Sequence, residues 1–308
     1  VIVLRGPWGD WDSPGEPTAI TIGVLDGVHK GHRELLKRLD PTLLRTVLTF
    51  DPHPVEVLRP GTAPRLITTI DERIALLEAA GVGCVGVLDL GDIKEQTPRE
   101  FIDRILVDLL SVSQLVVGSD FRFGRDRSGD VALLTGLGVD LGFRVEVIDL
   151  LEAAEMPVSS SRIRALVEQG RVAEAADLLG SRFRLSNEVV DGDKRGREIG
   201  YPTANLRPPH RKLIPGNGVY ACFATVAGTT HRAAVNVGVR PTFGGEELLI
   251  EAFILDFDRE IYGEQLTLEF VQYLRPELAF DGVGELVEQM AVDVDQARSI
   301  LDSVPLRI

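Results

Sequence analysis

The sequence predicts two domains of different fold class: an α/β domain built on a doubly wound parallel sheet, followed by an antiparallel β-barrel with a C-terminal helix. The chain has 308 residues, more than one hydrophobic core usually supports. In residues 18–180, short apolar runs alternate with segments of helical periodicity. After Gly180, strand-like runs follow one another without long helices between them. We therefore expect the domains to span residues 1–180 and 181–308.

The strands expected in the first domain are nearly continuous apolar runs rich in β-branched residues, as in strands buried on both faces. These runs are residues 19–25, 45–50, 84–90, 114–120 and 144–150. Residues 71–81 and 98–111 instead carry apolar side chains at three- and four-residue spacing, which predicts helices. Parallel sheets bind ligands at the carboxyl ends of their strands, so we expect a site where the first strand turns into a helix.

The second domain contains five strand-like runs separated by turn residues, a pattern typical of an antiparallel sheet or barrel. The runs are residues 182–190, 218–226, 231–239, 248–257 and 265–274. Residues 284–302 place Leu286, Met290, Val294, Ala297 and Leu301 on one helical stripe. We expect this helix to pack on the barrel.

The composition is that of an ordinary globular protein, with 44% hydrophobic and 26% charged residues. No apolar run reaches the roughly 18 residues that cross a bilayer, and the first residues lack the basic region of a signal peptide. We therefore expect a cytoplasmic protein. Cys84 and Cys222 lie in apolar, strand-like runs and are predicted to be buried, neither disulfide-bonded nor bound to zinc.

The formal net charge of −14 disfavours a nucleic-acid-binding surface, because phosphate backbones attract clustered Lys and Arg. A small phosphorylated ligand needs only a local group of amides and a few cations. We expect no nucleic-acid partner and no membrane partner, and the sequence leaves a weak homo-oligomer open.

Two histidines, His29 and His32, lie in residues 21–32, TIGVLDGVHKGH, between a predicted strand and a predicted helix. Three glycines allow a ligand to approach the backbone closely, and the helix start offers unpaired N–H groups to an anion. They are Gly23, Gly27 and Gly31. The pattern predicts a phosphate site that is neither the dinucleotide fingerprint nor a P-loop.

Two other interpretations of the histidines compete with phosphate binding. A lone H-x-x-H is most often a pair of surface or capping residues. Zinc would need ligands from elsewhere, and only His53, His210 and His231 remain, without a cysteine cluster. The position at a strand-to-helix turn favours phosphate.

Residues 158–164, VSSSRIR, form a second motif, and together with the first they resemble the two signatures of the H-x-G-H nucleotidyltransferase superfamily. Residues 49–54, TFDPHP, and 116–130, VVGSDFRFGRDRSGD, narrow the resemblance to the bacterial bifunctional riboflavin kinase/FAD synthetase family. It runs along nearly the whole chain. Leu25, Val158 and Ser161 depart from the family's usual Phe, Ile and Thr but keep the general chemistry of their positions.

The resemblance implies that residues 1–180 are a Rossmann-like FMN adenylyltransferase, which converts FMN and ATP to FAD and pyrophosphate. The FMN phosphate is already an anion, so the reaction needs in-line positioning and charge stabilisation but no general base. The implied catalytic residues are His29, His32 and Arg164. The implied nucleotide-binding residues are Gly23, Asp26, Gly27, Gly31, Ser159, Ser160 and Ser161.

The resemblance also implies flavin contacts, for which structural alternatives stay open. The implied residues are Phe50, Asp51, Pro52, Asp120, Phe121, Phe123 and Arg275. The corner at residues 51–54 could be a structural turn, and either phenylalanine could be a core residue. Arg275 could equally be an exposed arginine at a helix entry.

Residues 192–206, GDKRGREIGYPTANL, resemble the nucleotide loop and metal motif of riboflavin kinases, although a basic hairpin turn is the structural alternative. The implied nucleotide-binding residues are Gly192, Lys194, Arg195, Gly196 and Arg197. Thr203 and Asn205 supply neutral oxygens of the kind that a phosphate-bound Mg²⁺ accepts, and they are the implied metal ligands.

Kinase chemistry requires a base, because the nucleophile is the neutral 5′-hydroxyl of riboflavin. Glu251 lies in the apolar run 248–257, where a charge is costly unless function or pairing compensates it. The family's catalytic Glu occupies this place. The alternative is a Glu on the solvent face of an edge strand.

The resemblance thus implies a bifunctional transferase in which residues 181–308 convert riboflavin and ATP to FMN and ADP, and residues 1–180 then make FAD. ATP is the implied co-substrate and Mg²⁺ the implied cofactor; flavins are substrate and product. An enzyme that keeps one activity, or a regulator that only binds flavin or nucleotide, is the alternative.

Overall fold

The structure, a computed structural model, describes residues 1–148, 152–153, 156–192, 196, 199–242 and 245–305. Internal contacts divide the chain into two compact units, residues 1–160 and 161–308, which are described in turn. Among the helices within these ranges, none is both long and apolar enough to cross a membrane.

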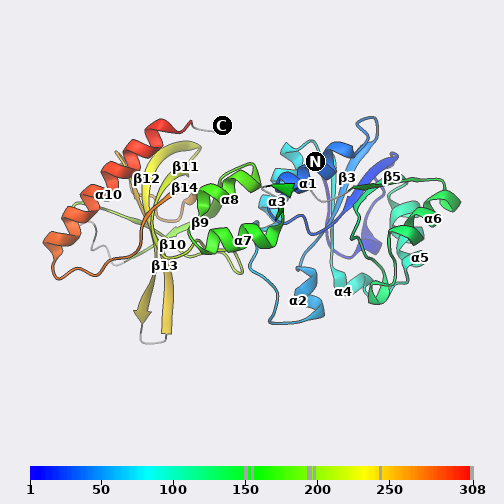
Figure 1. The fold of residues 1–308 in the computed structure, drawn as a ribbon, viewed down its shortest axis with the longest axis horizontal. Helices are drawn as coiled ribbons and strands as arrows, with labels where there is room; N and C mark the ends of the chain where they lie inside the picture. Colours follow the sequence, from blue (N-terminus) through cyan, green and yellow to red (C-terminus); the bar gives the residue numbers. More distant parts are fainter. Residues whose placement is uncertain (149–151, 154–155, 193–195, 197–198, 243–244, 306–308) are drawn as a thin grey trace. The chain divides into compact units, whose positions relative to one another are not determined.

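The first unit, coloured from blue to green in Figure 1, contains a six-stranded sheet. Every pair of neighbouring strands is parallel, and the order is β1-β4-β3-β2-β5-β6. Its strands are β1 (Ile2–Leu4), β2 (Thr18–Ile22), β3 (Leu44–Phe50), β4 (Cys84–Leu88), β5 (Val112–Gly118) and β6 (Arg144–Ile148). The predicted parallel sheet is confirmed. The strand order reverses at β2, between β3 and β5, which is where such sheets bind ligands.

Alternate residues of each strand enter one of two apolar cores, because successive side chains point to opposite faces. Ala19, Val47 and Val116 belong to a core with Leu36 of α1 and Leu77 of α3. The next residue of each strand, Ile20, Leu48 and Val117, belongs to a core shared with α5 and α6. Helices therefore cover both faces of the sheet, as a doubly wound fold requires.

The helices of this unit mostly agree with the sequence pattern. They are α1 (Lys30–Arg38), α2 (Pro54–Leu58), α3 (Ile70–Ala79), α4 (Leu90–Ile93), α5 (Pro98–Phe101), a continuing π-helical segment (Ile102–Leu109), α6 (Val131–Leu141) and two short 3₁₀ turns (Trp8–Asp10, Arg125–Arg127). Thr69 and Glu72 form a reciprocal capping box that sets the start of α3. β1 and α6 lack a pattern strong enough to predict them.

The second unit contains a closed barrel of six antiparallel strands in the order β10-β13-β12-β11-β14-β9. They are β9 (Phe183–Val190), β10 (Ala204–Leu206), β11 (Gly218–Val226), β12 (Thr229–Thr242), β13 (Gly245–Ile254) and β14 (Gln265–Arg275). Five strands match the predicted runs. β10 has only three residues, too few for a periodic signal.

Within the described residues, the helices α7, α8 and α10 accompany the barrel. The C-terminal helix α10 (Val283–Ser303) packs on it as predicted, and its Ala297 and Leu301 join Ala221 and Phe223 in one apolar core. α7 (Ser160–Glu168) begins at the boundary between the units, and α8 (Val172–Leu179) contacts β9 and β14. A two-residue antiparallel pair, β7 (Glu152–Ala153) and β8 (Met156–Pro157), precedes α7.

Both cysteines are buried and free, as predicted. Burial raises the pKa of the Cys84 thiol to about 11 and that of Cys222 well above its ordinary value. Neither thiol is ionised at neutral pH, so both serve as small core residues.

Candidate active sites

A tight turn at residues 25–28 follows the carboxyl end of β2 and leads directly into the H-x-G-H residues, which form the start of α1; we call residues 25–32 the H-x-G-H turn. His29 is the N-cap of α1, and its Nδ1 accepts a hydrogen bond from the backbone N–H of His32 at 3.4 Å. The two imidazole rings stack with centroids 3.5 Å apart. The turn thus presents both histidines together at the start of a helix, where N–H groups and the helix dipole favour an anion.

His32 is uncharged at neutral pH. Burial lowers the pKa of its imidazole well below 6.5, and the neighbouring His29 and Arg73 lower it further. A neutral imidazole donates one hydrogen bond through its single N–H. Any action of His32 on a phosphate therefore rests on that hydrogen bond and not on a positive charge.

The second motif begins beside the first. A Cβ at Gly31 would lie 3.2 Å from the His29 ring and 3.4 Å from the Val158 carbonyl, so the glycine allows this approach. Ser160 Oγ donates a hydrogen bond of 2.9 Å to the Asp26 carbonyl. The structure therefore brings the start of the second motif to the turn, whereas Ser161 and Arg164 belong to the second unit.

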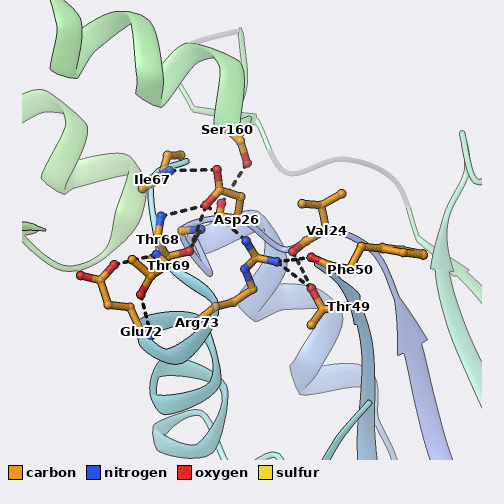
Figure 2. A network of polar contacts seen from close by, with 11 residues as sticks. Val24, Asp26, Thr49, Phe50, Ile67, Thr68, Thr69, Glu72, Arg73 and Ser160 are labelled. Atoms are coloured by element: carbon orange, nitrogen blue, oxygen red, sulfur yellow. Dashed lines mark hydrogen bonds and ion pairs between the residues drawn. The ribbon is translucent and has the colours of Figure 1, made fainter. Parts of the chain in front are cut away.

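The Asp26 side chain has partners inside the protein. Its carboxylate is fully buried and accepts hydrogen bonds from the Ile67 and Thr68 backbone N–H groups, at 3.0 and 2.9 Å, and from Thr68 Oγ1 at 2.9 Å (Figure 2). Asp26 was expected to contact a nucleotide. This carboxylate instead anchors the turn to the segment before α3.

In the first unit, the residues expected to bind flavin lie at or after the ends of β3 and β5, the two strands that flank β2. Phe50 ends β3, the Asp51–Pro52 peptide is cis, and His53 caps α2 by accepting from the Val55 backbone N–H at 3.2 Å. Asp51 is exposed. This segment lies at the same edge of the sheet as the H-x-G-H turn.

The two phenylalanines after β5 differ in exposure. Their rings stack with centroids 5.5 Å apart, but Phe123 is 8% exposed and is part of the apolar core, whereas Phe121 is half-buried at its margin. Asp120, next to Phe121, is exposed. Phe123 is thus the structural member of the pair, and Phe121 is the more accessible.

Five predicted residues of the second unit line one cavity of about 350 Å³: Gly196, Thr203, Asn205, Glu251 and Arg275. Glu251 on β13 lies opposite Asn205 on β10 and opposite Asn236 on β12. Directly opposed residues point to the same face, so the three polar side chains form a row across three strands. The alternative of a Glu251 on an edge strand is wrong, because β13 is paired on both sides within a closed barrel.

The loop over this cavity requires glycine at two positions. A Cβ at Gly192 would overlap the Asn205 side chain, and one at Gly196 would overlap the Tyr201 carbonyl. The predicted basic residues Lys194, Arg195 and Arg197 lie outside the described residues. The described part of the loop therefore packs directly against the expected metal ligands.

Arg275 ends β14 and is held by α10. Its Nε and Nη2 donate to the two carboxylate oxygens of Asp293 at 2.8 and 2.7 Å, and Gln289 Nε2 donates to Asp293 at 3.0 Å. Asp293 is 4% exposed. Arg275 is therefore a fixed part of the cavity wall, and the alternative of an exposed helix-entry arginine is wrong.

The polar residues of this cavity that sequence reasoning missed include Asn236 and Asp293. Glu251 was singled out as a polar side chain within an apolar, strand-like run. Asn236 lies in the apolar run 231–239 and shows the same pattern. Asp293 carries no such signal, because it is one of many acidic residues on a helix. Leu286, Met290 and Val294 of α10 add an apolar wall.

The chain joins a parallel-sheet domain with an H-x-G-H turn to a barrel with a glycine loop and a Thr-x-Asn pair. This combination defines a two-domain enzyme that transfers groups from nucleotides. The FAD synthetase family model matches residues 12–162, and the riboflavin kinase family model matches residues 179–301.

Curated relatives match along almost the full chain. The bifunctional riboflavin kinase/FMN adenylyltransferase of Listeria monocytogenes is 37% identical over 288 residues, 91% of each chain, and that of Escherichia coli K12 is 35% identical over 303 residues, 96% of each. The chain belongs to the bifunctional riboflavin kinase/FMN adenylyltransferase family. It is an enzyme with two activities, which form FMN from riboflavin and FAD from FMN with ATP as co-substrate.

A solved structure is similar over the whole chain as well. A crystal structure from Streptococcus pneumoniae, described as a macrolide-efflux protein, superposes with a TM-score of 0.88 at 31% identity, and covers 97% of this chain and 99% of its own. The similarity supports the arrangement of a parallel-sheet unit followed by a barrel unit.

Proposed function

We propose that residues 181–308 phosphorylate riboflavin and that residues 1–180 adenylylate the FMN so formed. The observation that carries the kinase assignment is the convergence of Thr203, Asn205, Glu251 and Arg275 on one cavity. The H-x-G-H turn, the start of the 158–164 motif and the 51–54 corner support the adenylyltransferase assignment, because they meet at the carboxyl edge of the sheet.

In the kinase cavity, Glu251 accepts the proton of the 5′-hydroxyl as that oxygen attacks the γ-phosphorus of ATP, the bond from the γ-phosphorus to the bridging oxygen breaks, and ADP leaves. Asn205 and Asn236 lie on either side of this carboxylate and can orient the hydroxyl. Arg275, held rigid by Asp293, contacts the flavin. The apolar α10 wall gives the flavin ring a surface on which to pack.

The same cavity fits a magnesium ion. Thr203, Asn205 and Glu251 bring hydroxyl, amide and carboxylate oxygens to one wall, the hard donors that Mg²⁺ prefers, and Gly192 leaves room beside Asn205. Thr203 and Asn205 would hold the ion. When bound, Mg²⁺ neutralises charge on the phosphates. Gly192, Lys194, Arg195, Gly196 and Arg197 are proposed to bind the nucleotide.

In the first domain, the ionised FMN phosphate attacks the α-phosphorus of ATP and pyrophosphate leaves. His29 and His32 donate hydrogen bonds to phosphate oxygens, and Arg164 with Ser159, Ser160 and Ser161 binds the leaving phosphates. Gly23, Gly27 and Gly31 allow the close approach. Phe50, Asp51, Pro52, Asp120 and Phe121 are proposed flavin contacts, and Phe123 supports Phe121 from the core.

We further propose that both reactions take place in the cytoplasm, on free riboflavin, FMN and ATP, without a nucleic-acid or membrane partner. Incubation of the full chain with riboflavin, ATP and Mg²⁺, followed by chromatography, tests the proposal. FMN should form first and FAD afterwards, and FMN supplied directly should give FAD. Accumulation of FMN alone would contradict the adenylyltransferase assignment, and absence of any phosphorylated flavin would contradict the kinase assignment.

A further inference from the structure

The H-x-G-H turn has a backbone that its own residues do not favour. Leu25, Gly27 and Val28 have φ values of 48°, 86° and 40°. The left-handed region suits glycine but is unfavourable for any residue with a Cβ, and a β-branched residue such as Val28 is rarely found there. Such a conformation persists only where the surrounding structure holds it.

A buried polar network supplies this support at both ends of the turn (Figure 2). At the start, Thr49 Oγ1 donates to the Val24 carbonyl at 2.8 Å. Further along, the Asp26 carboxylate binds Ile67 and Thr68, and the Gly27 N–H donates to Thr68 Oγ1 at 3.1 Å. The turn is therefore fixed from β3 on one side and from the 67–69 segment on the other.

Arg73 of α3 joins the two sides of this network. Its Nη1 donates to Thr49 Oγ1 at 2.9 Å and to the Phe50 carbonyl at 3.2 Å, while Nη2 lies 3.9 Å from Asp26 Oδ1. Only a planar guanidinium offers donors in this fixed arrangement. Arg73 is 2% exposed, so its charge is buried and its side chain has almost no surface for a ligand to contact.

Phe50 is a proposed flavin contact and directly precedes the Asp51–Pro52 corner, so Arg73 contacts the proposed flavin segment as well as the proposed phosphate turn. We propose that Arg73, acting with Asp26 and Thr49, is a positioning residue for adenylyl transfer: it holds the H-x-G-H turn and the flavin corner in the one arrangement that aligns FMN with ATP. The inference rests on the adenylyl transfer proposed for this turn. A misplacement of about 1 Å is enough to cost such a reaction 100-fold in rate.

The electrostatic effect of Arg73 on His32 is consistent with this positioning role. The arginine contributes to the lowered pKa of His32, so its charge also reaches the histidine pair. Arg73 therefore acts on the turn in two ways: through its hydrogen bond to Thr49, which in turn binds the Val24 carbonyl, and through its positive charge.

The test measures both activities of the full chain in the variants Arg73→Met and Arg73→Lys. Arg73→Met should lower kcat for FMN adenylylation at least tenfold while the KM for ATP changes less than threefold, and riboflavin phosphorylation should stay within twofold. Arg73→Lys keeps the charge but lacks the planar fork, and it should still lose at least fivefold in kcat. Thr49→Val should also lower kcat for FMN adenylylation.

Leu77→Ala is the matched control, because Leu77 lies one turn further along α3, is fully buried and belongs only to the apolar core. It should lower the melting temperature and leave kcat within twofold. The inference is overturned if Arg73→Lys keeps adenylylation within twofold, or if Leu77→Ala loses as much kcat as Arg73→Met. His29→Asn separates the two proposals: if it too leaves adenylylation intact, the site at this turn is itself wrong.

Discussion

The two candidate sites are held in place by different means. In the barrel, Glu251 is positioned by strand pairing, since its neighbours Asn205 and Asn236 are its direct partners in the ladder. At the sheet edge, His29 and His32 sit on a strained turn that depends on Thr49, Thr68 and Arg73 from other segments. A site built on backbone pairing tolerates changes in its surroundings better than one held by a few buried side chains.

The Glu251→Gln variant should separate the activities of the two sites most clearly. The amide keeps the shape of the carboxylate but cannot accept the proton, so kcat for riboflavin phosphorylation should fall at least about 100-fold. FAD formation from supplied FMN should stay within twofold. Initial rates for the two substrates, measured on one preparation, check this, and equal loss of both activities would contradict the division between domains.

His29→Asn is the counterpart in the first domain. Asparagine is a favoured N-cap residue, so it can replace the hydrogen bond to the His32 backbone while removing the imidazole. Removing one donor to a transition-state oxygen costs about 100-fold in kcat. FMN adenylylation should fall by this factor with the melting temperature unchanged, and His29→Ala, which also loses the cap, should melt lower. An unchanged rate of adenylylation would remove His29 from the mechanism.

The Asp293→Asn variant tests the ion pair between Asp293 and Arg275 in the wall of the barrel cavity. Weakening the charged pair with Arg275 should raise the KM for riboflavin about tenfold, since a hydrogen bond to a charged group contributes about 1.5–3 kcal/mol. Asp256→Asn is the control, because Asp256 makes the same two-bond pairing with Arg298 but is exposed. Such surface pairs contribute about 0–1 kcal/mol. If both variants changed the KM equally, Arg275 would not be the flavin contact.

The smallest expected effect concerns pH. The His32 pKa lies well below 6.5 in the folded chain, so between that lower value and 6.5 the unfolded chain binds the proton more readily than the native chain. Native stability should therefore fall as pH drops below about 6.5, by at most about 1.4 kcal/mol per pH unit from this group. Unfolding free energies of wild type and His32→Gln at several pH values check this. A slope that is the same in both would show that His32 is not the group responsible.

The sequence predicted the barrel site better than the sheet-edge site for a physical reason. Glu251 and Thr203 stand out within short local patterns, and antiparallel pairing then brings neighbouring runs together. Asp26 also lies in a recognised motif, but its partners Ile67, Thr68 and Arg73 are some 40 residues further along. A short motif does not reveal whether a carboxylate points to a ligand or into the protein, so the inward direction of Asp26 required the structure.

The closeness of Gly192 to Asn205 makes residue 192 a steric control on the cavity that we propose binds Mg²⁺. A single methyl group at residue 192 would displace the Asn205 amide while leaving every oxygen donor chemically intact. Variation at residue 192 is therefore constrained by volume, whatever charge the loop carries.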